Sequence, residues 1–186
     1  MISPVHSLGP GERVCLWTRG CGKACPGCIA PELWEHSGPQ VDEALLARLL
    51  RETARRDGCR GLTISGGDPM EQSGALLRLL RCVREDFTDI LVYTGWTLEE
   101  LRTGAAGAVG LACLELIDVL ADGRYEREKN RPDCVLRGSE NQRLHFLNPA
   151  LEPIYRDYMA RGRILESFTH GDTLIVTGIP DRRMEE

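Results

Sequence analysis

The stretch CGKACPGC, residues 21–28, places three cysteines on one short segment, with three and then two residues between them. Thiolates of Cys21, Cys25 and Cys28 at this spacing can reach one metal centre. A structural zinc site needs four protein ligands in a closed set, and no second Cys/His pair follows at zinc-finger spacing. A cubane iron–sulfur cluster held by three thiolates keeps one iron open for a substrate or cofactor. The motif therefore favours a catalytic [4Fe-4S] cluster over zinc or a structural cysteine cluster.

The residues around the motif predict a strand that runs into a cluster-binding loop. Residues 13–18, RVCLWT, have the β-branched and aromatic character of a strand. Glycines at 20, 22 and 27 allow a tight fold around a bulky group. Residues 42–56 then carry leucines at the spacing of one helix face, which predicts the first crossover helix.

A second strand, turn and helix follow directly. Residues 61–65, GLTIS, predict a short strand that runs into GGDP at 66–69, and apolar spacing predicts a helix over the following residues up to Val83. A glycine pair at the carboxyl end of a parallel strand exposes backbone groups where α/β folds bind ligands. Such a turn alone is more often a plain connection. After a three-cysteine loop, a ligand-binding turn is the favoured interpretation.

The rest of the chain predicts further strands with polar groups at their ends. Residues 89–94 predict a third strand, and Thr97 with Glu100 has the form of a capping box. Residues 116–121 predict a fourth strand, after which Asp122-Gly123 is either a hairpin turn or part of a site. Beyond residue 148, the pattern predicts a helix over 151–160 and a terminal hairpin from strands 164–168 and 173–177.

Composition limits the class of protein. The chain has 186 residues, 42% hydrophobic and 27% charged, which is enough for one globular domain with a core. Its start lacks the basic and apolar segments of a signal peptide, so the eight cysteines predict a reducing, cytoplasmic setting and not a disulfide framework. No apolar stretch is long enough to span a membrane. The formal net charge of −5 gives no indication of nucleic-acid binding.

Several motifs together resemble a known family. The cysteine spacing is that of radical S-adenosylmethionine (radical SAM) enzymes. CPGC followed by PELW at 31–34 is similar to the activating enzymes of anaerobic ribonucleotide reductases, which activate glycyl-radical enzymes. YTGW at 93–96, IDVLADGRY at 117–125 and RGSENQR at 137–143 resemble segments of the same enzymes in the same order. The resemblance covers about residues 8–147.

The resemblance implies a site and its cofactors. It implies a [4Fe-4S] cluster on Cys21, Cys25 and Cys28, with S-adenosylmethionine at the open iron. The turn at 66–69 would hold the methionyl end, and Gly27, Ile29 and Thr94 would contact the adenosyl portion. No catalytic side chain is expected beyond the cluster and cofactor. The residues expected at the cofactor are Gly27, Cys28, Ile29, Gly66, Gly67, Asp68, Pro69, Thr94 and Asp122.

The resemblance also implies an activity and partners. The reduced cluster would cleave S-adenosylmethionine to a 5′-deoxyadenosyl radical, which would install a glycyl radical on a partner such as anaerobic ribonucleotide reductase. A flavodoxin or ferredoxin would donate the electron. A second hypothesis is direct modification of a peptide, nucleoside or other substrate. It stays open because the chain departs from the resemblance at Leu8 before Gly9-Pro10-Gly11, at Ala30 beside the cluster and in the added tail. A non-catalytic iron–sulfur or zinc module is the third.

The expected fold is α/β, a partial, open parallel β/α barrel of about five to six strands with outer helices and the site at the carboxyl ends of the strands. Residues 1–186 are expected to form a single domain. Its core would cover about residues 8–147, and a helix and hairpin extension about 148–180.

Overall fold

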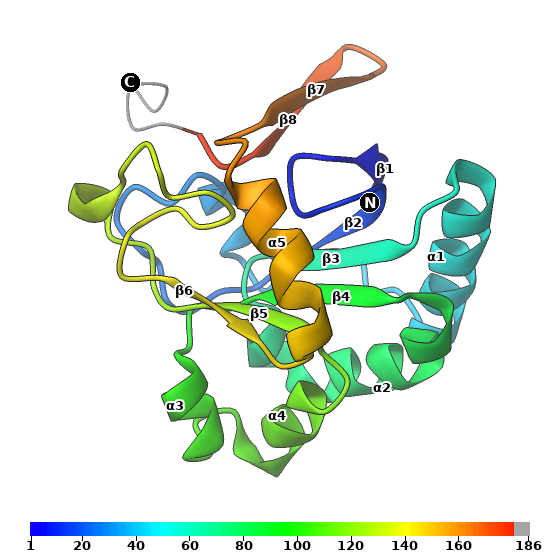
Figure 1. Cartoon of the computed structure of the whole chain (residues 1–186). Helices are drawn as coiled ribbons and strands as arrows, with labels where there is room; N and C mark the ends of the chain where they lie inside the picture. Colours follow the sequence, from blue (N-terminus) through cyan, green and yellow to red (C-terminus); the bar gives the residue numbers. More distant parts are fainter. Residues whose placement is uncertain (181–186) are drawn as a thin grey trace.

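A computed structural model describes residues 1–180, apart from the side chain of His170, and shows a sheet with helices on both faces (Figure 1). The sheet has six strands that lie side by side in chain order. They are β1 (Ile2–Val5), β2 (Arg13–Thr18), β3 (Gly61–Gly66), β4 (Asp89–Tyr93), β5 (Val119–Asp122) and β6 (Arg143–Phe146).

The sheet is parallel only in its middle. Strands β2 to β5 pair in parallel, whereas β1 pairs antiparallel with β2, and β6 antiparallel with β5. Residues 6–12, between β1 and β2, are too few for the crossover of a dozen or more residues that a parallel pair needs. The α/β class and the expected number of strands are confirmed. The wholly parallel arrangement is corrected at both edges, and the sheet is open, without closure into a barrel.

Five α-helices lie in the described part of the chain. They are α1 (Glu43–Asp57), α2 (Ser73–Val83), α3 (Leu98–Arg102), α4 (Gly107–Leu114) and α5 (Glu152–Met159). Helix α1 begins where the Asp42 carboxylate accepts hydrogen bonds from two backbone N–H groups, and it ends at Gly58 in the left-handed conformation. The predicted capping box of Thr97 and Glu100 is present at the start of α3.

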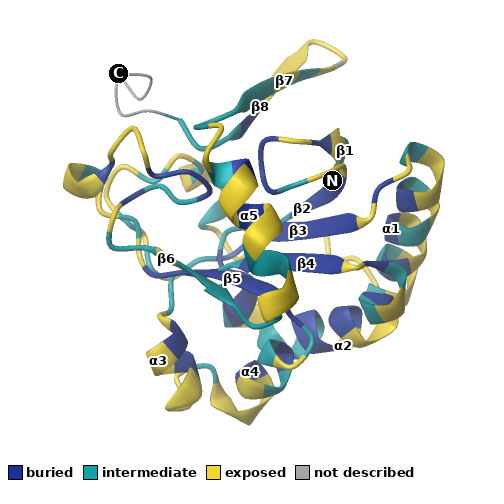
Figure 2. Cartoon of the chain, in the orientation of Figure 1, coloured by how far each residue is buried: buried dark blue, intermediate teal, exposed yellow. Residues whose placement is uncertain are grey.

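The strands bury apolar side chains on both faces because helices cover both faces, as Figure 2 shows for the central strands. On β4, Ile90 and Val92 pack into the cluster formed with α1, α2 and α4. Leu91, between them, points the other way and packs into a second cluster with Tyr155 and Tyr158 of α5. Helix α5 thus fills the face opposite the crossover helices, which fixes the sheet between two apolar layers.

The predicted terminal hairpin is confirmed. Strands β7 (Leu165–His170) and β8 (Thr173–Gly178) pair antiparallel as a separate two-stranded sheet. Figure 1 shows this hairpin above β1, at one edge of the main sheet. Phe168 packs against an apolar cluster that includes Val5 and Leu8, so the hairpin is attached near the start of the chain.

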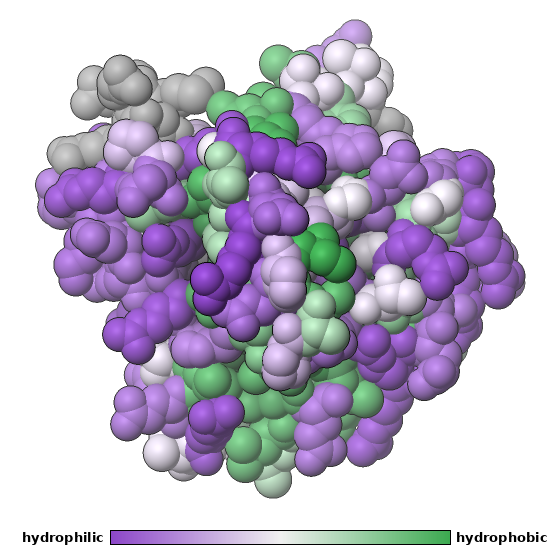
Figure 3. Space-filling view, viewed as in Figure 1, coloured by the Kyte–Doolittle hydropathy of each residue, from purple (hydrophilic) through white to green (hydrophobic). Residues whose placement is uncertain are grey.

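The outer surface is mostly hydrophilic on the face shown in Figure 3, with hydrophobic residues gathered around α4 below the end of α5 and, at the top of the view, at the base of the β7–β8 hairpin. Val109 and Leu111 of α4 are among the exposed large hydrophobic residues. None of the helices within residues 1–180 combines the length and the apolar run needed to cross a bilayer.

A buried charged pair joins the central strands. Arg13, at the start of β2, is fully buried, and its guanidinium donates to Asp89 of β4 over 2.5 Å and to Thr63 of β3 over 2.7 Å. The Tyr155 hydroxyl of α5 donates to the same carboxylate over 2.9 Å. Burial alone would lower the pKa of Arg13, but Tyr155 and Asp89 outweigh burial and raise it above its ordinary value. One cation therefore links three strands and, through Asp89, helix α5.

Replacing Arg13 by Met is expected to lower the free energy of unfolding by about 3–5 kcal/mol, because Asp89 then stays buried without its cation. The exposed Arg48 of α1 provides the control, and Arg48→Met is expected to change stability by less than about 0.5 kcal/mol. Urea unfolding followed by circular dichroism measures both. Equal midpoints for the two variants would contradict the role of the buried pair.

Candidate active site

A cavity of about 180 Å³ lies at the carboxyl ends of β3, β4 and β5. The loop after β2 forms one side, and the loop between β5 and β6 forms another. The chain that follows β8 also reaches it. The lining residues are Cys21, Lys23, Cys25, Gly27, Cys28, Ile29, Trp34, Ser65, Gly66, Gly67, Tyr93, Thr94, Gly95, Gly123, Arg124, Tyr125, Asn130, Gly138, Gln142, Ile179 and Pro180.

All three cysteines of the motif line this cavity as half-buried free thiols. The loop that carries them is closed at its base, where Gly20 N donates to Leu33 O over 2.8 Å and Cys21 N donates to Trp34 O over 2.9 Å. Burial raises the pKa of the Cys21 thiol above its ordinary value. A bound metal would instead lower the pKa of this thiol, because a coordinating thiol loses its proton.

The donor set fits a cluster better than a single ion. Three thiols and no carboxylate face the cavity, and soft sulfur donors are the ligands of iron–sulfur clusters. Within residues 1–180, the cavity lining holds no fourth Cys and no His, Asp or Glu that could complete the four-ligand set of a structural zinc site. The residues present therefore fit a [4Fe-4S] group.

The glycine turn after β3 packs directly on the cysteine loop. Gly67 N donates to Thr18 O and Asp68 N donates to Gly20 O, each over 2.8 Å. A Cβ atom on Gly67 would overlap the carbonyl oxygen of Gly20. The sequence indicated that this glycine allows a ligand to approach. In the structure it allows the approach of the loop backbone, while also lining the cavity.

Lys23, between the first two cysteines, is a feature that the sequence did not reveal. Its side chain is only 3% exposed. Its ammonium lies 3.1 Å from Asp68 and 3.1 Å from Glu71, and 3.7 Å from the centre of the Trp96 ring. Glu71 also accepts from the Gly22 N–H over 2.8 Å. The cysteine loop is thus held by ion pairs to the turn and the residues just after it, and by a cation–π contact to the segment that follows β4.

Asp68 supports the site from behind and does not line the cavity. Its carboxylate is buried, and besides Lys23 it accepts hydrogen bonds from Thr94 Oγ1 over 2.8 Å and from the N–H groups of Gly95 and Met70 over 3.0 Å each. Every lone pair of this carboxylate is committed within the fold. The structure therefore places Asp68 where it orients the ends of β3 and β4.

Asp122 has a similar place at the end of β5. It is buried and accepts from Leu98 N at the start of α3 over 2.6 Å and from His145 Nε2 of β6 over 2.8 Å. Among the residues expected at the cofactor, Asp68, Pro69 and Asp122 lie outside the cavity lining. Those that line it are Gly27, Cys28, Ile29, Gly66, Gly67 and Thr94.

The polar segment 137–143 forms part of the wall. Gln142 lines the cavity, accepts from the N–H groups of Gly138 over 2.8 Å and Ser139 over 3.1 Å, and donates to Gly123 O over 2.8 Å. The segment is therefore fastened to the end of β5. Its periodicity gave no sign of this, because the contacts form between a loop and the end of a distant strand.

Tyr93 is a further lining residue that sequence spacing did not single out. Its hydroxyl oxygen is buried and has no hydrogen-bond partner within the described residues. Burial raises the pKa of this hydroxyl above its ordinary value, so the group stays neutral. Tyr93 therefore contributes to the cavity wall while its hydroxyl stays enclosed within the fold.

Replacing Gly67 by Ala is expected to lower the free energy of unfolding by about 1–3 kcal/mol, because the added methyl group must push the Gly20 carbonyl away. The matched control is Gly22→Ala, on the cysteine loop that packs against the turn. A Cβ atom there would meet Glu71 at an ordinary 3.5 Å. Urea unfolding of the metal-free protein checks both, and an unchanged Gly67→Ala midpoint would show that the turn and loop can separate freely.

Comparison with known proteins places this site in a family. A model of the 4Fe-4S single cluster domain matches residues 7–145, which include all three cysteines and the glycine turn. The anaerobic ribonucleoside-triphosphate reductase-activating protein of Escherichia coli K12 is 33% identical over 145 residues, covering 75% of this chain and 91% of that protein. The protein of the same name from Pasteurella multocida is 37% identical over 140 residues, covering 72% and 87%.

A viral relative extends the comparison. The anaerobic ribonucleoside-triphosphate reductase-activating protein of Enterobacteria phage T4 is 34% identical over 141 residues, covering 73% of this chain and 85% of that protein. The matches span most of each relative, so they concern whole proteins and not one shared motif. The resemblance drawn from the motifs is confirmed: this chain belongs to the 4Fe-4S single cluster domain family, in the group that includes the anaerobic ribonucleoside-triphosphate reductase-activating proteins.

Proposed function

We propose that this protein is a radical SAM activating enzyme that uses a [4Fe-4S] cluster on Cys21, Cys25 and Cys28 to install a glycyl radical on an anaerobic ribonucleotide reductase. The relatives are named for activating that reductase. Residues 1–186 would act as a single domain, with the site at the carboxyl ends of its parallel strands.

One observation carries the proposal. The three thiols and the ends of three parallel strands line the same cavity. A structural cluster would be enclosed by its own loop, whereas these thiols face a space that continues past Gly66 and Gly67 to Thr94 and the loop after β5. A cavity at this edge of a parallel sheet is where α/β proteins bind ligands. The space beside the thiols supports a second bound molecule, which we propose is S-adenosylmethionine.

The residues of the chain would bind S-adenosylmethionine, orient it at the cluster and shield it from water. When bound and supplied with one electron by an external donor, the cluster and S-adenosylmethionine would provide reductive cleavage of the cofactor to methionine and a radical that takes a hydrogen atom from the partner. Backbone groups of Gly66 and Gly67 face the cavity and would hold the methionyl end, with Asp68 fixing their position from behind. Gly27, Ile29 and Thr94 would contact the adenosyl portion.

The open sheet supports a macromolecular substrate. The edge strands β1 and β6 end the sheet, so loops instead of further strand and helix units surround the cavity. Ile29 next to the third cysteine is 63% exposed although it lines the cavity. Its side chain would therefore be accessible to a docking segment as well as to the cofactor. We propose that this segment is a glycine-containing loop of the reductase.

Anaerobic reconstitution is expected to load about four irons per chain with the spectrum of a cubane cluster. Replacing Cys21, Cys25 or Cys28 by Ala is expected to abolish loading, because three thiolates are the minimum for this cluster. The control is Cys59→Ala, whose thiol is buried against Ser3 and outside the cavity lining. Iron analysis and absorption spectra measure the effect. Stoichiometric zinc without iron uptake would contradict the proposal.

Incubation of the loaded protein with S-adenosylmethionine, a strong reductant and the reductase is expected to yield 5′-deoxyadenosine and a persistent radical on the reductase. Electron paramagnetic resonance should show a doublet that collapses when the glycine α-hydrogens are replaced by deuterium. A stable mass change on another substrate with no persistent radical would replace the activating role by direct modification. Absence of 5′-deoxyadenosine under all these conditions would remove the radical SAM function altogether.

A further inference from the structure

The last described residues of the chain form part of the cavity wall. Ile179 and Pro180 line the same cavity as the three cysteines. The family model ends at residue 145, so this part of the wall comes from a segment outside the family match. The helix α5 and the hairpin of β7 and β8 lead the chain from the edge of the main sheet to this position.

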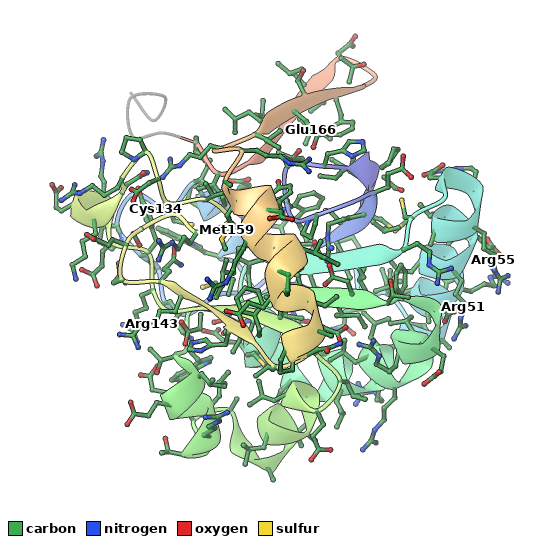
Figure 4. All side chains as sticks on the ribbon, in the orientation of Figure 1. Arg51, Arg55, Cys134, Arg143, Met159 and Glu166 are labelled. Atoms are coloured by element: carbon green, nitrogen blue, oxygen red, sulfur yellow. The ribbon has the colours of Figure 1, made fainter. Side chains whose placement is uncertain are left out.

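The hairpin is fixed to the start of the chain by polar contacts, one of which is buried. The Glu166 carboxylate of β7 accepts from His6 N over 2.8 Å and from Ser7 N over 2.7 Å. Figure 4 labels Glu166 on this hairpin, near β1. The hydroxyls of Ser7 and Thr177, both buried, lie 2.9 Å apart. These contacts hold the hairpin in one position relative to the main sheet.

The chain then turns at Gly178 toward the cavity. This residue has a φ of 111°, in the region that favours glycine, and an added Cβ atom would overlap the carbonyl oxygen of Ile164. Ile179 follows immediately and packs with the cluster that includes Val5 and Cys15 while also lining the cavity. The turn therefore directs an apolar side chain to the site.

Arg163 joins this end of the chain to the opposite wall. Its guanidinium donates to Pro180 O, to Asn130 Oδ1 over 2.7 Å and to Arg131 O over 2.5 Å. Asn130 itself lines the cavity. One side chain thus connects two walls that are far apart in the sequence, which fixes the width of the cavity on this side.

We propose that Ile179 and Pro180 make an apolar contact with bound S-adenosylmethionine, and that Arg163 positions them for it. The inference rests on the proposed function for the identity of the ligand. An apolar wall opposite a polar turn removes water from one side of the ligand, which strengthens the polar contacts on the other. The extension after residue 145 would then complete the cofactor site.

Binding of S-adenosylmethionine to the loaded protein, measured by anaerobic equilibrium dialysis, tests the contact without turnover. Ile179→Ala removes three carbon atoms from the wall and is expected to raise Kd roughly three- to tenfold. The control is Val176→Ala on the same hairpin, which is 59% exposed and outside the cavity lining. It is expected to leave Kd unchanged.

Arg163→Met tests the positioning role, with the exposed Arg161→Met as its control. Arg163→Met is expected to raise Kd about as much as Ile179→Ala, and the double variant little more, because both changes act on one wall. The two single variants, the double variant and the Arg161→Met control should all load iron equally, since the three cysteines lie on another loop. A truncated variant that ends at Gly178 tests the wall contact a second time. Its affinity for S-adenosylmethionine is expected to fall tenfold or more.

The outcomes separate this inference from the function it rests on. If the unaltered, loaded protein does not bind S-adenosylmethionine, the proposed function fails. If it binds and Ile179→Ala and the variant ending at Gly178 bind equally well, the function stands and the wall contact is wrong. Loss of iron from Ile179→Ala would also overturn the inference, because the residue would then act on the cysteine loop.

Discussion

Two backbone hydrogen bonds, Gly67 N to Thr18 O and Asp68 N to Gly20 O, hold the end of β3 against the start of the cysteine loop. They continue the parallel ladder of β2 and β3, which pairs Thr18 with Gly66, beyond the last paired residues. Because the ladder fixes the register, the loop and the turn must leave the sheet at the same edge. A side chain at position 67 would break this continuity, so the rest of the site depends on a glycine there.

Buried charge fixes the same junction from the side. Lys23 would be costly to bury alone, but two carboxylates and an aromatic ring surround its ammonium. Asp68, which follows β3, in turn accepts hydrogen bonds from Thr94 and Gly95 at the end of β4 as well as the ion pair from Lys23. Movement of the cysteine loop would separate Lys23 from Asp68 and leave the buried carboxylate without its cation. Opening the junction would therefore cost free energy, which favours the closed arrangement of loop and turn.

The sequence predicted those parts of the fold that local patterns determine. The central strands, the helix over 151–160, the terminal hairpin and the capping box of Thr97 and Glu100 follow from periodicity and caps. Strand β1 was missed because its neighbours in sequence are rich in glycine, proline and serine. Strand β6 was missed because it has only four residues and directly follows a polar loop. Their antiparallel pairing depends on partners distant in the sequence, which no local pattern reveals.

The site was predictable to a similar degree. Motif spacing identified the cysteine loop and the glycine turn, which the structure brings together on one cavity. Spacing could not show that the Asp68 carboxylate faces inward, since that depends on donors from Lys23 and Thr94. Nor could it place Ile179 in the wall. Because backbone hydrogen bonds hold the centre of the site and side chains such as Arg163 hold its rim, substitutions at the rim can change what the cavity admits while the loop and turn stay in place.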